Sequence, residues 1–220
     1  MRKVSQLKPD IVLRHVSKSF GNIEVLRDVS ITMEGGHIYG FVGRNGSGKT
    51  VLMKCICGFI PVTSGEIEVN GNVIPKSARI PEGIGAIIET PGFLPQYSGY
   101  RNLKLLADIQ GKTGKEGVRN ALMKVGLDPL MRRHVSAYSL GMRQRLGIAQ
   151  AIMEDPPILL LDEPMNSLDE RAVGIVRRLL LEEKERGKLI VIATHVKEDV
   201  ELLCDDVYQM RGGTAERMEI

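Results

Sequence analysis

Apolar and polar residues alternate in short runs over the first part of the chain, and turn residues separate the runs. Runs of this length, with Gly and Asn-Gly between them, predict strands. Asn70-Gly71 in particular is a favoured hairpin turn. We therefore expect short strands at Ile11–Leu13, Val29–Met33, Glu66–Val69 and Asn72–Ile74, and a further strand at Gly85–Ile88.

The spacing of apolar residues changes to a helical period between about Ser98 and Glu154. Gly126 is expected to end the second of the helices in this segment. The segment is predicted to be a helical subdomain. Its apolar faces are Leu103, Leu106, Ala107 and Ile109; Val118, Leu122 and Val125; and Leu146, Ala149, Ile152 and Met153.

Predicted strands and helices alternate in the last part of the chain, which indicates a parallel sheet with helices packed on it. The charged run Glu182–Arg186 is expected to be a solvated helix end. The expected elements are a strand at Ile158–Leu161, a helix from about Glu170 to Arg186, a strand at Leu189–Ala193, a short helix near Lys197–Leu203 and a last strand near Val207.

Length and charge limit the class of protein. The 220 residues suffice for one sizeable domain with a small subdomain. A net charge of +3 without a long basic block argues against nucleic acid as the main partner. No apolar run approaches the length needed to cross a bilayer, and the first residues lack an apolar signal core. We expect the chain to meet a membrane only through a partner.

Cys55 and Cys57 lie two apart on a predicted helix and so face nearly opposite sides, which argues against a zinc site. Buried helix thiols are the better interpretation. The low, odd cysteine count, completed by Cys204, fits a reducing cytosol.

Residues Gly43–Thr50 match the phosphate-binding loop pattern G-x-x-x-x-G-K-[ST]. The apolar run Ile38–Val42 before it predicts a strand, and Val51–Ile56 after it can start a helix, which is the context the motif requires. Backbone N–H groups of such a loop and the helix N-terminus attract phosphate oxygens. Lys49 can reach the β- and γ-phosphates, and the Thr50 hydroxyl can bind Mg²⁺. This context weighs against a chance glycine turn, so we predict nucleotide binding.

Asp162 and Glu163 follow four apolar residues and are expected at the carboxyl edge of the sheet, where ligands bind in such folds. Asp162 can hold Mg²⁺ through water or Thr50, and Glu163 can orient and deprotonate a water molecule. The alternative, two acids that open a loop, is weaker in a chain with a phosphate-binding loop. His195 ends another strand at the same edge and could contact the γ-phosphate or the attacking water, although a lone His there is usually structural.

Ser139 precedes an amphipathic helix and is a natural N-cap. Its hydroxyl, the Gly141 N–H and the helix dipole would form a second anion site. Simple capping is the alternative, and the two are compatible.

With these motifs in this order, the chain resembles the ATP-binding subunit of ABC transporters over essentially its full length. The resemblance identifies Gly43–Thr50 as Walker A, Ile158–Asp162 as Walker B, Tyr138–Met142 as the signature and Asn166–Asp169 as the D-loop. It implies an α/β P-loop NTPase with a mixed or parallel sheet core, an N-terminal antiparallel β-subdomain and an inserted helical subdomain. Residues 1–220 would form one domain, with 1–90 and 155–220 as the RecA-like core plus β-subdomain, and about 91–154 as the helical signature subdomain.

The resemblance also implies that ATP and Mg²⁺ are the cofactors. It makes Glu163 the catalytic glutamate, His195 the switch histidine, and Thr50, Glu89 and Asp162 the metal ligands. Two subunits, a homodimer or a pair of related chains, would sandwich each ATP head to tail, so that Ser139 and Gly141 act on the partner's nucleotide. Separate integral-membrane permease subunits would place the chain on the inner face of the cell membrane. The nucleotide-binding residues would be Phe20 (stacking on adenine), Gly43, Arg44, Asn45, Gly46, Ser47, Gly48, Lys49, Thr50, Val51, Ser139, Gly141 and Asp169.

Two departures from the family pattern narrow the resemblance. The signature has Leu140 and Met142 where Gly and Gln are common, and Glu89 stands where the family has its Q-loop glutamine. Both features resemble the bacitracin-resistance and lantibiotic-export branch, which implies export of a peptide antibiotic or drug. Phe93 and Leu94, after Glu89, are candidates to contact the permease, with anchoring in the chain's own core as an equal alternative. Members of this branch often continue further, so the sequence leaves open whether a C-terminal extension is missing.

Other classes of P-loop protein fit less well. A GTPase should carry an N-K-x-D motif, which the sequence lacks, and a small-molecule kinase would not need the run Tyr138–Gln144. The spacing of the motifs leaves no room for the long coiled coil of DNA-repair ABC proteins, and translation types usually carry two such domains. A single-domain ABC ATPase that regulates a membrane partner without transport remains the alternative.

Overall fold

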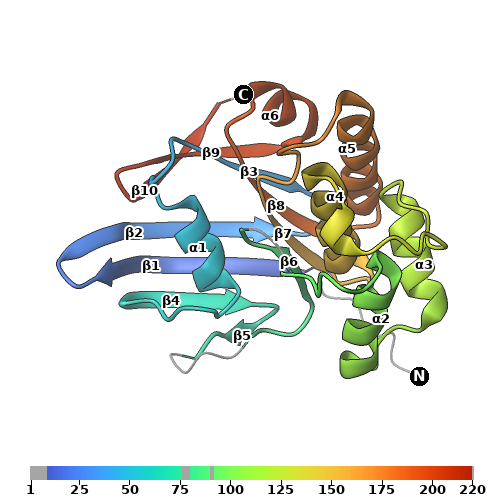
Figure 1. Ribbon diagram of the computed structural model, residues 1–220. Helices are drawn as coiled ribbons and strands as arrows, with labels where there is room; N and C mark the ends of the chain where they lie inside the picture. Colours follow the sequence, from blue (N-terminus) through green and yellow to red (C-terminus); the bar gives the residue numbers. More distant parts are fainter. Residues whose placement is uncertain (1–8, 76–79, 90–91, 220) are drawn as a thin grey trace, which may run out of the picture.

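The strands of the chain form two sheets, and helices α2 to α5 gather beside the larger one (Figure 1). This computed structural model describes residues 9–75, 80–89 and 92–219. A four-stranded sheet has the order β2-β1-β4-β5, and a six-stranded sheet has the order β10-β9-β3-β8-β7-β6. The strands are β1 (Asp10–Phe20), β2 (Ile23–Glu34), β3 (Ile38–Val42), β4 (Ser64–Val69), β5 (Asn72–Val73), β6 (Ile84–Ile87), β7 (Ile158–Asp162), β8 (Leu189–Thr194), β9 (Asp206–Arg211) and β10 (Thr214–Met218). The helices are α1 (Lys49–Ile56), α2 (Gly99–Gln110), α3 (Lys115–Lys124), α4 (Leu140–Ile152), α5 (Glu170–Glu185) and α6 (Lys197–Leu203), with a 3-10 turn at Val135–Ala137.

The smaller sheet is antiparallel, as expected, but its first two strands are longer than their apolar runs. β1 pairs with β2 on one side and with β4 on the other. His15 and Asp28 have positive φ angles where the register of β1 and β2 shifts, so these strands continue through irregularities that alternation alone does not reveal. The hairpin turn at Asn70-Gly71 is confirmed, with φ angles of 49° and 74° between β4 and β5.

The larger sheet is parallel except for its last strand. β6, β7, β8, β3 and β9 pair in parallel, and β10 pairs antiparallel with β9. The alternation predicted after Ile158 is confirmed, but the strand expected near Val207 is not the last. β10 escaped prediction because its residues are polar and mostly exposed, so they show no apolar run.

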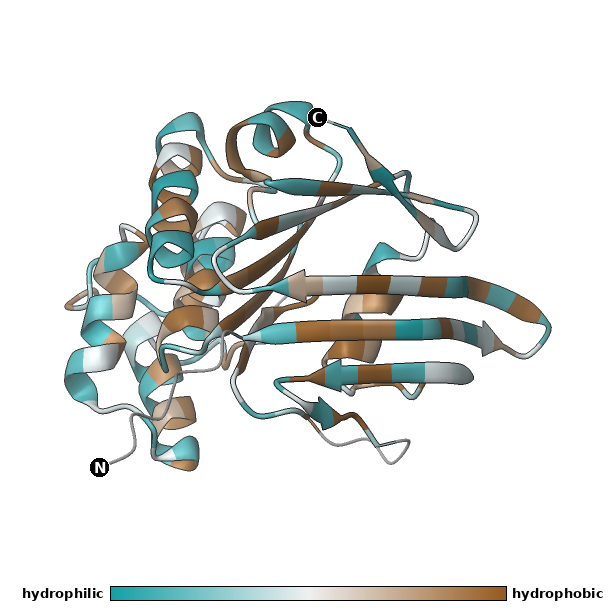
Figure 2. Ribbon diagram, turned by 180° about the vertical axis from the view of Figure 1, so that it is seen from behind, coloured by the Kyte–Doolittle hydropathy of each residue, from teal (hydrophilic) through white to brown (hydrophobic). Residues whose placement is uncertain are grey.

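Residues of β7 alternate between two hydrophobic cores. Leu159 and Leu161 belong to a core completed by α2, α3, α4 and α5, whereas Ile158 and Leu160 belong to a core shared with α1 and the smaller sheet. Figure 2 shows the apolar strands of the larger sheet in brown across the middle of the molecule. The strand that carries Asp162 is therefore packed on both faces, as is usual for parallel strands.

The helical spacing of apolar residues predicted between about Ser98 and Glu154 is confirmed by α2, α3 and α4, with one exception. Leu103 and Ala107 are fully buried, but Ile109 is 81% exposed because it lies two residues from Ala107 and so points away from that face. Gly126 follows the end of α3 with a φ angle of 70°, which confirms it as the stop signal. No helix within the described ranges is long and apolar enough to cross a bilayer.

The expectation of a solvated end for α5 is wrong at Glu183, whose side chain is 1% exposed. Its carboxylate pairs with Lys124 of α3 at 2.7 Å, with Lys188 at 2.5 Å and with Arg186 at 2.7 Å. Burial raises the pKa of Glu183, but hydrogen bonds from Lys124 and Lys188 outweigh it and hold the pKa below its usual value. Asp155 pairs with Arg186 and Lys188 and completes a cluster that joins α3, α5 and the start of β8.

The expectation of buried thiols is confirmed for the two cysteines at α1. Cys55 and Cys57 are each 1% exposed. Burial raises the pKa of Cys55 to about 11 and that of Cys57 to about 12, so neither is a thiolate near neutral pH.

Candidate nucleotide-binding site

The predicted phosphate-binding loop lies between β3 and α1. Glycine is required at Gly48, because φ is 106° and a Cβ atom would lie 3.0 Å from the Leu26 side chain and from the Val25 carbonyl oxygen. At Gly43 a Cβ atom would lie 2.5 Å from the Met210 carbonyl oxygen. These close approaches let the loop turn tightly over the end of β3 and start α1 at Lys49, two residues before the predicted helix start.

Lys49 is 6% exposed, and its ammonium group reaches back across the loop. Its Nζ donates to the carbonyl oxygens of Gly43 at 2.7 Å and Arg44 at 3.2 Å. The Ser47 hydroxyl is buried and has no hydrogen-bond partner among the described residues. The Ser47 hydroxyl is therefore available to an anionic oxygen, which fits phosphate binding.

A cleft of about 300 Å³ opens in front of the loop, and its walls combine the two predicted motifs. It is lined by Val25, Asn45, Gly46, Ser47, Gly48, Lys49, Thr50, Val51, Asp162 and Glu163.

Thr50 and Asp162 meet at the edge of this cleft. The Thr50 Oγ1 donates to Asp162 Oδ2 at 2.7 Å, which joins the first turn of α1 to the end of β7. Hydroxyl and carboxylate oxygens are ligands that Mg²⁺ prefers. No group of three or more His, Cys, Asp or Glu side chains that could hold a metal occurs in the part of the chain the structure describes. Thr50 and Asp162 would provide two oxygen ligands for such an ion.

Glu163 and His195 are brought together from the ends of β7 and β8, as their placement at one sheet edge predicted. The His195 Nδ1 lies 2.8 Å from Glu163 Oε1. Glu163 has a φ angle of 49°, and its N–H donates to the Ala193 carbonyl oxygen at 2.9 Å. Non-glycine residues in this conformation are uncommon and gather at functional sites.

Glu89 lies two residues after β6, with a φ angle of 62°. Its Oε1 accepts a hydrogen bond from Lys54 Nζ at 2.7 Å. Sequence patterns did not single out Lys54, because the contact joins residues 35 apart in the chain. Glu89 lines a second cleft of about 300 Å³, beside the first, with Leu140, Arg143, Gln144, Asp162, Glu163, Asn166 and Ser167.

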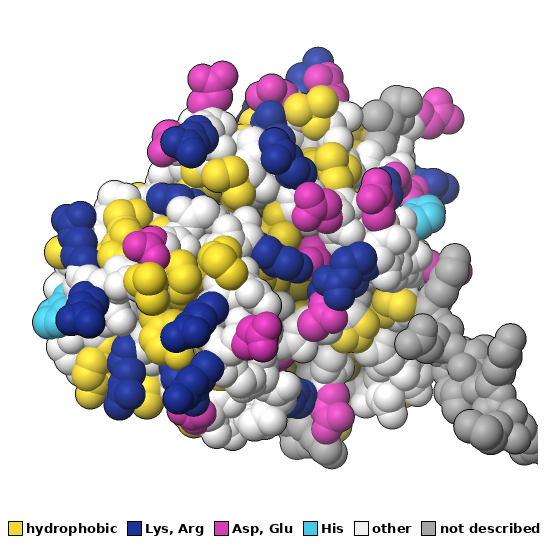
Figure 3. Space-filling view, turned by 90° about the vertical axis from the view of Figure 1, so that its right-hand side faces the viewer, with side chains coloured by type: hydrophobic (Ala, Val, Ile, Leu, Met, Phe, Trp, Pro, Cys, Tyr) yellow, Lys and Arg dark blue, Asp and Glu magenta, His cyan; other side chains and the backbone are white. Residues whose placement is uncertain are grey.

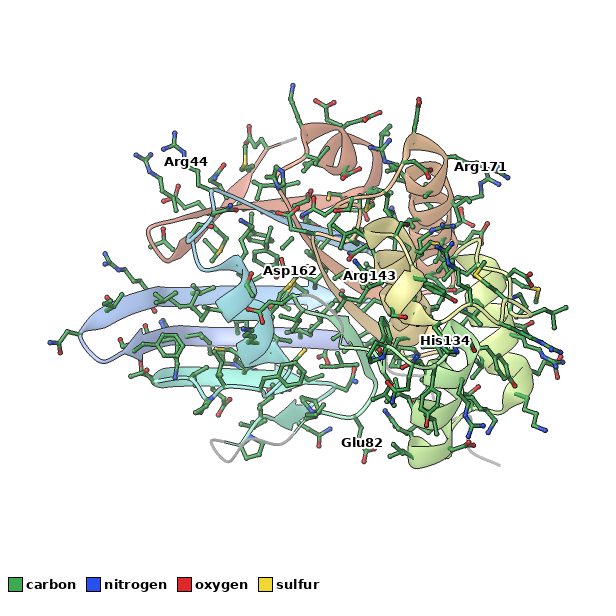
Figure 4. All side chains as sticks on the ribbon, viewed as in Figure 1. Arg44, Glu82, His134, Arg143, Asp162 and Arg171 are labelled. Carbon is green, nitrogen blue, oxygen red and sulfur yellow. The ribbon has the colours of Figure 1, made fainter. Side chains whose placement is uncertain are left out.

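Residues of the signature stand at the start of α4, next to the end of β7. Figure 4 shows Asp162 beside α1 and Arg143 on α4 across the second cleft. Ser139 is the N-cap of α4, as predicted, since its Oγ accepts from the Met142 N–H at 3.1 Å. Gly141 lies so close to the D-loop that a Cβ atom would be 2.6 Å from the Ser167 carbonyl oxygen.

The other predicted nucleotide contacts lie outside both clefts. Phe20 ends β1 and is 48% exposed, with the Lys18 ammonium 4.8 Å from the centre of its ring. One face of that ring already carries a cation, so an adenine would stack on the opposite face or displace Lys18. Asp169 is the N-cap of α5, and its Oδ1 accepts from the Ala172 N–H at 2.8 Å.

Comparison with known proteins decides the family. A family model described as ABC transporter matches residues 26–166, more than half of the chain. The chain belongs to the ABC transporter family. It is 43% identical over 95% of its length to an uncharacterized ABC transporter ATP-binding protein, YybJ of Bacillus subtilis, and covers 96% of that protein. It is 39% identical over 92% of its length to the bacitracin transport ATP-binding protein BcrA of Enterococcus faecalis, and covers 67% of it.

The fold agrees with the family. The dimeric structure of MJ0796, a bacterial ABC transporter cassette, superposes with a TM-score of 0.85 over 95% of this chain and 97% of that one, at 22% identity. The predicted α/β P-loop fold and the resemblance to ABC transporter ATP-binding subunits are confirmed, and the similarity to BcrA confirms the bacitracin branch. The chain is an ABC ATPase that binds and hydrolyses ATP.

Proposed function

We propose that this ABC ATPase is the subunit that powers a membrane exporter of a peptide antibiotic or drug. One observation supports the ATP-driven part of this proposal most: Lys49, the Thr50–Asp162 pair and the Glu163–His195 pair lie at the carboxyl ends of β3, β7 and β8. The substrate class is supported by the similarity to BcrA, a bacitracin transport protein.

The loop Gly43–Thr50 would hold the phosphates through its backbone N–H groups and Lys49. Thr50 and Asp162 would hold Mg²⁺, with Glu89 as a further ligand once its carboxylate leaves Lys54. When bound, the metal would supply positive charge to neutralise phosphate oxygens.

Glu163 would act as the general base that accepts a proton from the attacking water. His195, at 2.8 Å from the carboxylate, would orient the base and contact the γ-phosphate. The three segments that carry these groups meet at the carboxyl ends of β3, β7 and β8, where ligands bind in such sheets.

A second copy of the chain, or a related subunit, would complete the site. Ser139 and Gly141 would reach the partner's nucleotide from the start of α4, and Asp169 would lie at the same interface. The dimeric state of the similar cassette MJ0796 supports this arrangement. We further propose that residues 91–154 act as the signature subdomain, and that 1–90 with 155–220 form the catalytic core.

Permease subunits would hold the protein at the cytoplasmic face of the membrane. Phe93 packs against the chain's own core, whereas Leu94 is 46% exposed and Tyr97 is 38% exposed. Asn102, only 4% exposed, fixes Leu94 by accepting from its N–H at 2.8 Å and donating to its carbonyl oxygen at 3.1 Å. On the side that carries α2, α3 and α5, hydrophobic side chains lie among Lys and Arg (Figure 3). We propose Leu94 for the permease contact and Phe93 for anchoring its loop.

The test is the mass in solution of Glu163→Gln with and without Mg-ATP, together with its rate of phosphate release. We expect ATP-dependent dimers and almost no turnover, because the amide can orient water but cannot accept its proton. Lys49→Ala should lose nucleotide affinity and remain a monomer. Unchanged turnover in Glu163→Gln would remove Glu163 as the base, and a monomer that still binds ATP would remove the in-trans role of Ser139 and Gly141 in the isolated subunit.

A further inference from the structure

The backbone that follows β7 is held in an unusual conformation at both ends. Glu163 has a φ angle of 49° and Ser167 has a φ angle of 65°. Non-glycine residues persist in this region only where their surroundings impose it. Whatever imposes it also sets where the Glu163 carboxylate points.

Gln144, on the second turn of α4, contacts this backbone directly. Its side-chain amide donates to the carbonyl oxygens of Glu163 and of buried Pro164, at 3.2 Å each. Within the described ranges it is the one side chain that donates to a carbonyl group between Glu163 and Ser167. Two backbone bonds complete the support, from the Glu163 N–H to Ala193 at 2.9 Å and from the Asn166 N–H to Glu163 at 3.1 Å.

Gly141 lies three residues before Gln144 and therefore on the same side of α4. A Cβ atom there would be 2.6 Å from the Ser167 carbonyl oxygen, so the start of α4 contacts both ends of the strained segment. The helix itself is well anchored, because Leu146 and Ile148 are fully buried in the core. A rigid helix with a two-pronged donor is suited to fixing a short loop.

The chemistry of the side chain also fits this position. Gln144 lines the cleft that contains Glu89, Asp162 and Glu163. A lysine or arginine could make similar bonds, but its charge would compete with Mg²⁺ for the carboxylates. An amide donates to carbonyl oxygens and leaves the charge of the site unchanged.

We propose that Gln144 is a positioning residue for Glu163. Its amide fixes the carbonyl groups of Glu163 and Pro164, so that the carboxylate stays beside His195 and faces the phosphate-binding loop. This inference rests on the proposed role of Glu163 as the base. Ser139 and Gly141, which would contact the partner's nucleotide, lie at the start of the same helix. Gln144 therefore also links that contact to Glu163, the proposed base of the chain's own site.

The test compares Gln144→Met with Gln150→Met. Methionine matches the length of glutamine but cannot donate. Gln150 lies on the same helix, and within the described residues its side chain makes no hydrogen bond to the segment after β7. We expect Gln144→Met to lower kcat about 10- to 100-fold, since small displacements of a catalytic group have effects of this size. KM for ATP, the affinity for a fluorescent ATP analogue and Tm should stay close to wild type, and Gln150→Met should change none of them.

Adding Gln144→Met to Glu163→Gln provides the second measurement. If Gln144 acts through Glu163, the double variant should retain the residual turnover of Glu163→Gln. Independent, multiplicative losses would overturn the proposal, as would an unchanged kcat in Gln144→Met or a loss explained by weaker nucleotide binding. If Glu163→Gln loses turnover while Gln144→Met keeps it, only this inference fails; if Glu163→Gln keeps turnover, the assignment of the base fails first.

Discussion

Glu183→Gln should destabilise the protein strongly, although the residue belongs to none of the predicted motifs. The carboxylate is 1% exposed and binds Lys124, Lys188 and Arg186 at 2.5 to 2.7 Å. Glutamine preserves the size of the side chain and removes its charge. Lys188, itself only 7% exposed, would then keep Asp155 as its remaining anionic partner.

The size of the destabilisation depends on how well each cation can be solvated once the carboxylate is removed. Removing one partner of a buried ion pair costs about 3–5 kcal/mol. Lys124 and Arg186 are 43% and 48% exposed and can be solvated again, so we expect the lower end, about 3 kcal/mol. For a chain of 220 residues each kcal/mol shifts Tm by about 2–4 °C, which gives a fall of about 6–12 °C.

Thermal unfolding followed by circular dichroism, without nucleotide, measures this fall. Glu182→Gln is the matched control: it lies next to Glu183 on α5 but is exposed, so its effect should stay within about 0.5 kcal/mol. If Tm falls by less than about 2 °C in Glu183→Gln, or falls equally in the control, the reasoning is refuted.

Acid provides an independent check on the same carboxylate. Its pKa in the folded protein is lowered, so its contribution is present above the unfolded pKa and is lost as pH falls through the folded pKa. An unperturbed glutamate side chain has a pKa of 4.5. The difference in stability between wild type and Glu183→Gln should therefore be largest near neutral pH and should narrow steadily below about pH 4.5.

Three further predictions concern the site and the core. Glu89→Gln should remain an active ATPase in a phosphate-release assay, because an amide oxygen can also ligate Mg²⁺ and only the ion pair with Lys54 is lost; complete inactivity would give the carboxylate another role. Gly85→Ala should lower Tm by several degrees, since its Cβ atom would be 2.0 Å from the Ala151 carbonyl oxygen, and an unchanged melting curve would contradict that close approach. The Cys57 thiol, with its pKa raised to about 12 by burial, should react with a disulfide reagent at pH 8 only after unfolding; rapid labelling of this residue in the folded protein, located by peptide mapping, would show that it is accessible.

Local signals predicted the site best where one short segment carries the chemistry. The loop Gly43–Thr50 has its predicted strand and helix on either side. The loop after β3 brings Thr50 to Asp162 at the end of β7, and the ends of β7 and β8 bring Glu163 to His195. These inferences work because parallel strands share a carboxyl edge. Their success depends on topology rather than on side-chain detail.

Contacts between distant segments could not be predicted in the same way. Nothing near Glu89 in the sequence indicates Lys54, and nothing near Glu163 indicates Gln144, because helix packing brings them together. Glu183 is different, since it continues the buried face of Val176 and Leu180 at helical spacing. That pattern was present in the sequence, and the charge of the surrounding run concealed it.

Because β7 is packed on both faces, it is held more firmly than the segment that follows β6. Asp162 ends a strand whose residues are locked into two cores, so it cannot shift without disturbing both. Glu89 lies just beyond the end of β6, in a left-handed backbone conformation that a few dihedral rotations would change. When the nucleotide changes, we therefore expect Asp162, the proposed metal ligand, to stay in place and the backbone at Glu89 to turn, which would carry the change outward to helix α2.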